Sequence, residues 1–107
     1  MAIVFPNMPP IQAEIHLDLV DSNGGSNPEM NRDNARPMAV SLRNGEMWYG
    51  FVINDSTVDV IEPGRSAICR ISFLNHEGAK EVFQCGSSIL FGDGSVTRGV
   101  LRIFAFD

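Results

Sequence analysis

Apolar and polar residues alternate along much of this chain, and the alternation begins at Ile11. From Ile11 to Val20 every second residue is apolar, which predicts a strand with one dry face and one solvated face. The same period of two returns in residues 46–54 and 67–74, and residues 37–43 predict a shorter strand. One-sided alternation is typical of antiparallel sheets, which need only one buried face.

The strongest local signal is a hairpin in the last third of the chain. Residues 83–91 and 98–106 can both form strands, and Gly92-Asp93-Gly94-Ser95 separates them. Asp-Gly between apolar runs is among the best short-range hairpin signals. Gly86 and Gly99 are expected inside the two strands, where a glycine usually marks a bulge or the close approach of another backbone.

Two further turns complete the pattern. Asn44-Gly45 predicts a second hairpin, between residues 37–43 and 46–54. Residues 56–61 predict a further short strand, and Glu62-Pro63-Gly64-Arg65 after it has the Pro and Gly positions of a type II turn.

These elements predict an all-β fold. No stretch of ten or more residues has the i, i+3, i+4, i+7 spacing of an amphipathic helix, so less than about a tenth of the chain is expected in helix. Six or seven short strands with glycine and proline turns indicate a sandwich or a barrel. With 107 residues, the chain is expected to have an extended, proline-containing lead-in at residues 1–10 and a single domain at 11–107. The predicted core includes Ile15, Leu17, Cys69, Ile71, Phe73, Leu101 and Ile103.

The charge is unevenly distributed. The net charge is −5, with nine acidic residues against three arginines in residues 1–62 and four acidic against five basic residues in 63–107. An acidic chain is a poor candidate for non-specific nucleic-acid binding, which depends on a basic surface. The chain has neither a long apolar run nor a basic, signal-like N-terminus, so we expect a cytoplasmic protein that does not enter a membrane.

No residue pattern predicts catalysis or a bound cofactor. His16 and His76 lie 60 residues apart and are expected to be solvated. Cys69 and Cys85 are expected to be buried free thiols, with a disulfide as the alternative. No phosphate-binding loop or nucleophile elbow is present. We therefore expect a protein that is not an enzyme and that binds no nucleotide, metal or other cofactor.

Five segments, in order, resemble the C-terminal β-barrel domain of elongation factor Tu. They are Ala13-Glu14-Ile15-His16-Leu17, Gly24-Gly25 with Pro28, Arg36-Pro37, Pro63-Gly64, and the run from Phe91 through Gly92-Asp93-Gly94-Ser95-Val96-Thr97-Arg98-Gly99 to Val100. The resemblance implies a free-standing, six-stranded antiparallel barrel of the Greek-key type. In the factor, this barrel contacts aminoacyl-tRNA, the GTPase domain and the exchange factor. It carries no GTPase activity, because the P-loop belongs to another domain.

The polar segment 21–36 is the predicted docking loop, with a flexible connection that has no partner as the alternative. It is longer than most connections, and its acidic character differs from the family's basic loop, so the resemblance implies a partner protein rather than tRNA. We expect this loop to order fully only against that partner, with Met30 entering a pocket of the partner and Arg32 or Arg36 pairing with an acid at its rim. The predicted partner-binding residues are Asn27, Pro28, Glu29, Met30, Arg32 and Arg36.

Two functional hypotheses follow. The first is a non-enzymatic protein-binding module, for which small acidic immunity proteins and regulators are examples of the class. The alternative is an RNA-binding barrel, with tRNA as the ligand, that uses the arginines of the C-terminal half. Those arginines are Arg65, Arg70, Arg98 and Arg102.

Overall fold

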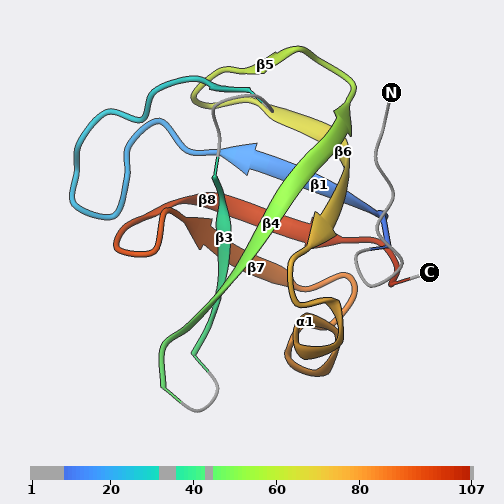
Figure 1. The fold of residues 1–107 in the computed structure, drawn as a ribbon. Coiled ribbons are helices and arrows are strands. Elements are labelled where there is room, and N and C mark those ends of the chain that lie inside the picture. Colours follow the sequence, from blue (N-terminus) through green and yellow to red (C-terminus); the bar gives the residue numbers. More distant parts are fainter. Residues whose placement is uncertain (1–8, 32–35, 43–44, 107) are drawn as a thin grey trace.

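Six antiparallel strands close into a barrel, as predicted (Figure 1). The computed structural model describes residues 9–31, 36–42 and 45–106. Around the barrel the strands are β1 (Ile11–Leu17), β6 (Ser66–Phe73), β4 (Met47–Ser56), β3 (Met38–Ser41), β7 (Ser88–Gly92) and β8 (Thr97–Ile103), and β8 pairs again with β1. Because β3, β4 and β6 are consecutive neighbours and β1 lies on the far side of β6, the topology is a Greek key.

The barrel interior is filled by the side chains that the alternation predicted. All seven predicted core residues are at most 2 % exposed: Ile15, Leu17, Cys69, Ile71, Phe73, Leu101 and Ile103. The prediction was wrong for Leu19, which is 67 % exposed. The chain leaves the barrel after Leu17, so the alternation no longer refers to the barrel interior beyond that residue.

The chain reverses at the three predicted turns, although Asn44 of the Asn44-Gly45 turn lies outside the described residues. The hairpins β3–β4 and β7–β8 are both antiparallel. In the turn from Glu62 to Arg65, the Arg65 amide donates to the Glu62 carbonyl at 3.0 Å, and Gly64 has φ of +85°. A positive φ at the third turn position is the reason a type II turn needs glycine there.

A short helix, α1 (His76–Val82), lies between β6 and the predicted strand at 83–91, in a segment for which no helix was predicted. The Asn75 side chain caps it by accepting a hydrogen bond from the Gly78 amide at 3.1 Å. Ala79 turns inward and is fully buried. The helix is seven residues long, about two turns, which is too short to show a repeating helical pattern in the sequence.

This helix also reverses several side-chain predictions. His76 is buried at 7 % exposure, with its ring edge-on to Phe106, and its Nδ1 atom has no hydrogen-bond partner among the described residues. Residues between α1 and β7 form a turn, so Cys85 is exposed and Gly86 lies outside any strand. Cys69 is buried as predicted, both cysteines are free, and burial raises the pKa of the Cys69 thiol.

Asp93 organises the β7–β8 turn. Its Oδ1 atom accepts hydrogen bonds from the amides of Ser95 and Val96 at 3.0 and 3.1 Å, and its Oδ2 atom accepts one from Arg98 Nη2 at 2.9 Å. The Val96 amide, then the Arg98 guanidinium and the Ser95 amide, lower the pKa of this carboxyl well below its usual range. All of these bonds favour the charged form.

The substitution Asp93→Asn should therefore destabilise the protein at neutral pH more than in acid. A carboxyl whose folded pKa is lowered contributes stability above its unfolded pKa of about 3.9, and this contribution is lost as the pH falls towards the folded value. Urea unfolding at steps from pH 7 to pH 2 should show the two proteins converging at the acid end. The effect should be small, because the Asp93 side chain is 42 % exposed. A gap that stays constant over this range would contradict the assignment.

Candidate protein-docking site

A two-stranded ribbon lies at one end of the barrel. In it β2 (Met30–Asn31) pairs antiparallel with β5 (Val60–Ile61), with Met30 opposite Ile61 and Asn31 opposite Val60. In Figure 1 β5 lies at the end of the molecule opposite α1. The ribbon brings the predicted docking loop against the segment that connects β4 to β6.

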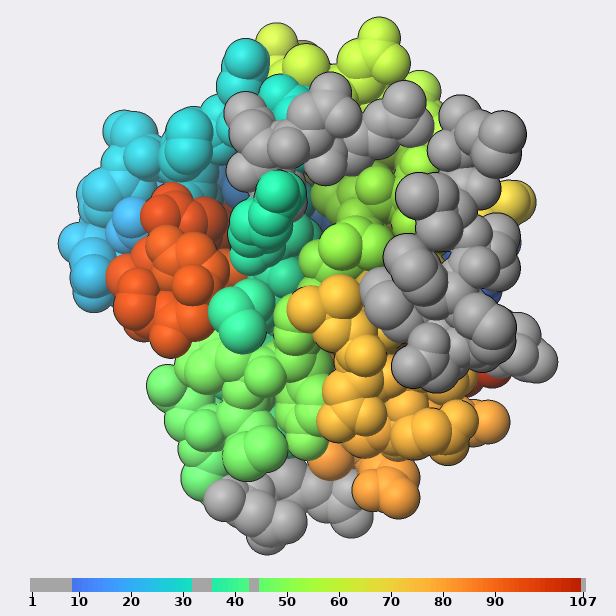
Figure 2. Space-filling view, viewed as in Figure 1, coloured from blue at the N-terminus to red at the C-terminus, as the bar shows by residue number. Residues whose placement is uncertain are grey.

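Polar side chains anchor the described part of the docking loop. Asn27 is buried, and its Nδ2 atom donates to the carbonyls of Asp18 and Arg98 at 2.9 and 3.0 Å. The Ser22 hydroxyl accepts a hydrogen bond from the Thr97 amide at 3.0 Å. Figure 2 shows this loop against the β7–β8 turn. Among residues 21–31 only Asn27 is buried, so hydrogen bonds rather than apolar packing hold the described part of the loop.

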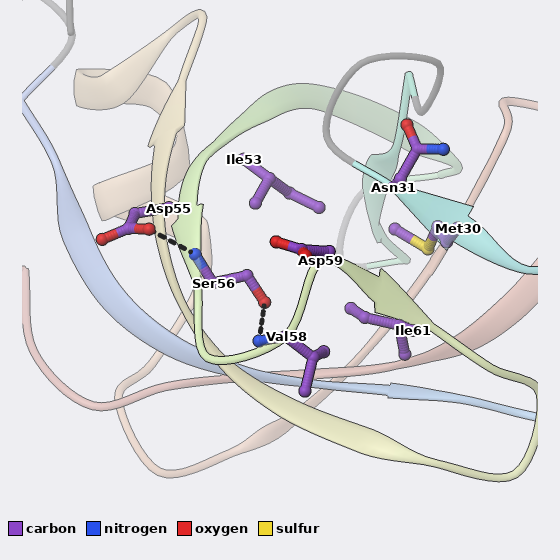
Figure 3. Close-up of a pocket in the computed structure, with 8 residues that line it drawn as sticks. All are labelled: Met30, Asn31, Ile53, Asp55, Ser56, Val58, Asp59 and Ile61. Carbon is purple, nitrogen blue, oxygen red and sulfur yellow. Dashed lines mark hydrogen bonds between the residues drawn. The ribbon is translucent and has the colours of Figure 1, made fainter. Parts of the chain in front are cut away.

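A hollow of about 290 Å³ lies between the ribbon and the C-terminal half of β4 (Figure 3). We call it the Met30 hollow. Its lining residues are Met30, Asn31, Ile53, Asp55, Ser56, Val58, Asp59 and Ile61. Met30 packs on the barrel core and forms part of the wall, so it does not project outward as predicted.

The floor and rim of the Met30 hollow differ in chemistry. The buried side chains of Ile53 and Ile61 are apolar, and Val58 is 44 % exposed. Figure 3 shows the Asp59 carboxylate pointing into the hollow, whereas Asp55 lies at the far rim beyond Ser56. The hollow therefore combines an apolar surface with a carboxylate.

Hydrogen bonds hold the segment that carries these groups. The Asp55 Oδ1 atom accepts from the Ser56 amide at 2.9 Å, and the Ser56 hydroxyl accepts from the Val58 amide at 3.3 Å. Neither Asp55 nor Asp59 forms an ion pair with a described side chain. Local hydrogen bonds therefore hold this turn. The Asp59 carboxylate remains available to pair with a cationic group that lies outside the described residues.

The predicted partner-binding residues are only partly brought together. Met30 lines the hollow, whereas Pro28, Glu29 and Arg36 are exposed outside its lining. Asn27 is a buried anchor of the loop rather than a contact surface. Arg32 lies outside the described residues.

Arg98, one of the predicted RNA-binding residues, is occupied by the protein itself. Its guanidinium is 2.9 Å from Asp93 Oδ2 and 3.8 Å from Asp21 Oδ2, and its Nη1 atom donates to Asn27 Oδ1 at 2.9 Å. These contacts tie the docking loop to β8. The carboxylates of Asp93 and Asp21 already balance the positive charge of Arg98 that an RNA phosphate would otherwise meet.

The other three predicted RNA-binding arginines are exposed but distributed among acidic residues. Arg70 lies opposite Asp55 in β4, and Arg102 lies opposite Glu14 in β1. Arg65 lies apart from both, in the turn before β6. Positive and negative positions therefore alternate across this face, which is a weak electrostatic basis for holding a phosphate backbone.

A second, more open hollow lies beside β3 and β7, past the point where these two strands stop pairing. The register of β3 with β7 ends at Ala39–Phe91, although β3 continues to Ser41. The hollow beyond this point has a volume of about 390 Å³. Leu42 and Leu90 at its edge are 67 % and 44 % exposed. None of its described lining residues is charged.

Three of the residues that line the Met30 hollow, Val58, Asp59 and Ile61, lie in the segment 56–61, which was predicted only as a short strand. The valines on either side of Asp59 could have indicated an exposed apolar surface. The pairing of β5 with β2 joins segments about 30 residues apart. Alternation within one strand does not specify its partner.

In the described part of the chain, no three His, Cys, Asp or Glu side chains gather as they would around a metal ion. The described helix is neither long enough nor apolar enough to cross a membrane. No protein-family model, curated protein or solved structure matches this chain. The resemblance to the elongation factor Tu barrel therefore stays a prediction.

Proposed function

We propose that this chain is a protein-binding module that docks on another protein through the Met30 hollow and the exposed valines beside it. The observation that carries the proposal is the combination of this hollow with Val58 and Val60, which are 44 % and 36 % exposed on the adjoining segment. Exposed apolar side chains around a polar group are typical of interaction sites.

The size and lining of the hollow favour docking over catalysis. At about 290 Å³ it lies at the bottom of the range for small-molecule sites, and it suits one side chain of a partner. Its described lining residues include no histidine, cysteine or lysine that could activate Ser56 as a nucleophile. The resemblance to a translation-factor barrel supports the same function, because that barrel is itself a docking surface.

Photo-crosslinking from position 58 in the source cell should identify the partner, whose affinity can then be measured with purified proteins. The double variant Val58→Asn/Val60→Asn removes apolar surface without changing the charge. It should weaken partner binding at least tenfold, which is about 1.4 kcal/mol.

The control is Leu42→Asn/Leu90→Asn in the second hollow. Leu90 has the same 44 % exposure as Val58, so loss of apolar surface is comparable at that position. The control should bind normally, and both variants should unfold cooperatively. Normal binding by the valine variant, or weakened binding by the leucine variant alone, would refute docking at the Met30 hollow.

A further inference from the structure

The Asp59 carboxylate is the one charged group seen pointing into the Met30 hollow in Figure 3. It has no ion-pair partner among the described side chains. A partner that covered the hollow with a purely apolar side chain would remove water from this carboxylate without replacing its interactions, which is unfavourable. The occupant therefore needs a group that can pair with Asp59.

The rest of the lining restricts that occupant further. Met30, Val58 and Ile61 supply an apolar wall beside the carboxylate. Lysine and arginine have an apolar stem and a cationic head, so one such side chain can satisfy both parts of the hollow.

The described charges that line the hollow or directly flank the ribbon have the same sign as Asp59. Asp55 lies at the rim, and Glu29 and Glu62 lie in the chain immediately next to β2 and β5. Two arginines of the described residues are near in the fold, but neither lines this hollow: Arg70 faces the neighbouring hollow that contains Gln12, and Arg36 is exposed after the ribbon. Arg32 lies outside the described residues. An acidic rim attracts a basic partner surface and repels an acidic one.

We infer that the partner presents a lysine or arginine side chain to the Met30 hollow, with its stem along Met30 and Val58 and its charged head at Asp59. This inference rests on the proposed protein-binding function and specifies the partner's chemistry. It reverses the sign expected from the sequence, in which Arg32 or Arg36 of this chain would pair with an acid of the partner.

The test is a titration of the full-length ¹⁵N-labelled chain with three blocked tripeptides, Ala-Lys-Ala, Ala-norleucine-Ala and Ala-Glu-Ala. Norleucine keeps the lysine stem but lacks its charge. The lysine peptide should shift the amide signals of Met30, Val58, Asp59 and Ile61 with a millimolar dissociation constant. The norleucine peptide should bind about two- to fivefold more weakly, because it cannot form the ion pair with Asp59, and the glutamate peptide should leave these signals unchanged at the same concentration.

Charge-neutral variants test the role of Asp59 directly. Asp59→Asn should weaken lysine-peptide binding about two- to fivefold, the range expected for one exposed ion pair. Glu77→Gln removes an equal charge from α1, at the opposite end of the barrel, and should leave the dissociation constant unchanged. Added salt should weaken binding to the wild type more than to Asp59→Asn.

Three results would overturn the inference: no shift of the hollow by the lysine peptide, equal binding of the norleucine or glutamate peptide, or equal effects of Asp59→Asn and Glu77→Gln. These results are distinguishable from a failure of the proposed function. A partner whose affinity falls with Val58→Asn/Val60→Asn would still dock at the hollow, although without a basic side chain in it. Conversely, the lysine peptide could bind the Met30 hollow while Val58→Asn/Val60→Asn leaves the affinity for the partner unchanged. That result would refute docking of the partner at the hollow, although the hollow itself would accept a basic side chain.

Discussion

Replacing Phe73 with alanine should lower the free energy of unfolding by about 3–5 kcal/mol, the range for large aromatic truncations in a core. Phe73 is fully buried in β6. Its ring stacks on Phe83 and Phe106 at centroid distances of 5.7 and 6.3 Å, and it meets Phe51 edge-on at 5.6 Å. The substitution therefore leaves a cavity where the barrel wall, the segment after α1 and the C-terminal segment meet.

Phe104→Ala is the matched control, because it removes the same side chain from a position that is 45 % exposed. In equilibrium urea unfolding, Phe104→Ala should lower the free energy of unfolding much less than Phe73→Ala does. Equal costs for the two variants would mean that Phe73 does not occupy the barrel interior as described.

The substitution Gly99→Ala should destabilise the barrel by about 3 kcal/mol or more, at the upper end for inserting atoms into a packed site. A Cβ atom at this position would overlap the carbonyl oxygen of His16 and come within 2.8 Å of the Phe91 ring. The carbonyl belongs to the neighbouring strand β1, so relief requires β1 and β8 to move apart. Thermal unfolding should show a large fall in the midpoint.

Gly50→Ala in β4 provides a control on the same kind of element. There the new Cβ would meet only the end of the flexible Leu74 side chain, at 3.0 Å. A small rotation of Leu74 relieves this contact, so the midpoint should change little. A comparable loss in both variants would indicate a general preference for glycine in these strands rather than a close approach at Gly99.

The sequence alone determined most of the barrel strands and most of the barrel interior. Alternation in β1 and β6 identified which face is buried, because successive side chains of a strand point to opposite sides. The turns at Asn44-Gly45, residues 62–65 and residues 92–95 identified where the chain reverses, because few residues accept the backbone angles that tight turns require. Gly99, a glycine within a predicted strand, was expected to mark a bulge or the close approach of another backbone, and the structure shows a close approach to β1.

The tertiary structure decided what depends on contacts between distant segments. The side chain of Asn27 is polar, yet it is buried, because Arg98 and two backbone carbonyls satisfy its hydrogen bonds. His76 is buried because α1 turns it towards Phe106. The Met30 hollow exists because β2 pairs with β5. Each of these strands is only two residues long, so neither segment carries a sequence pattern that identifies its partner. The periodicity of a segment predicts which of its faces is buried. Which other segment packs on that face or pairs with that strand is decided only when the whole chain folds.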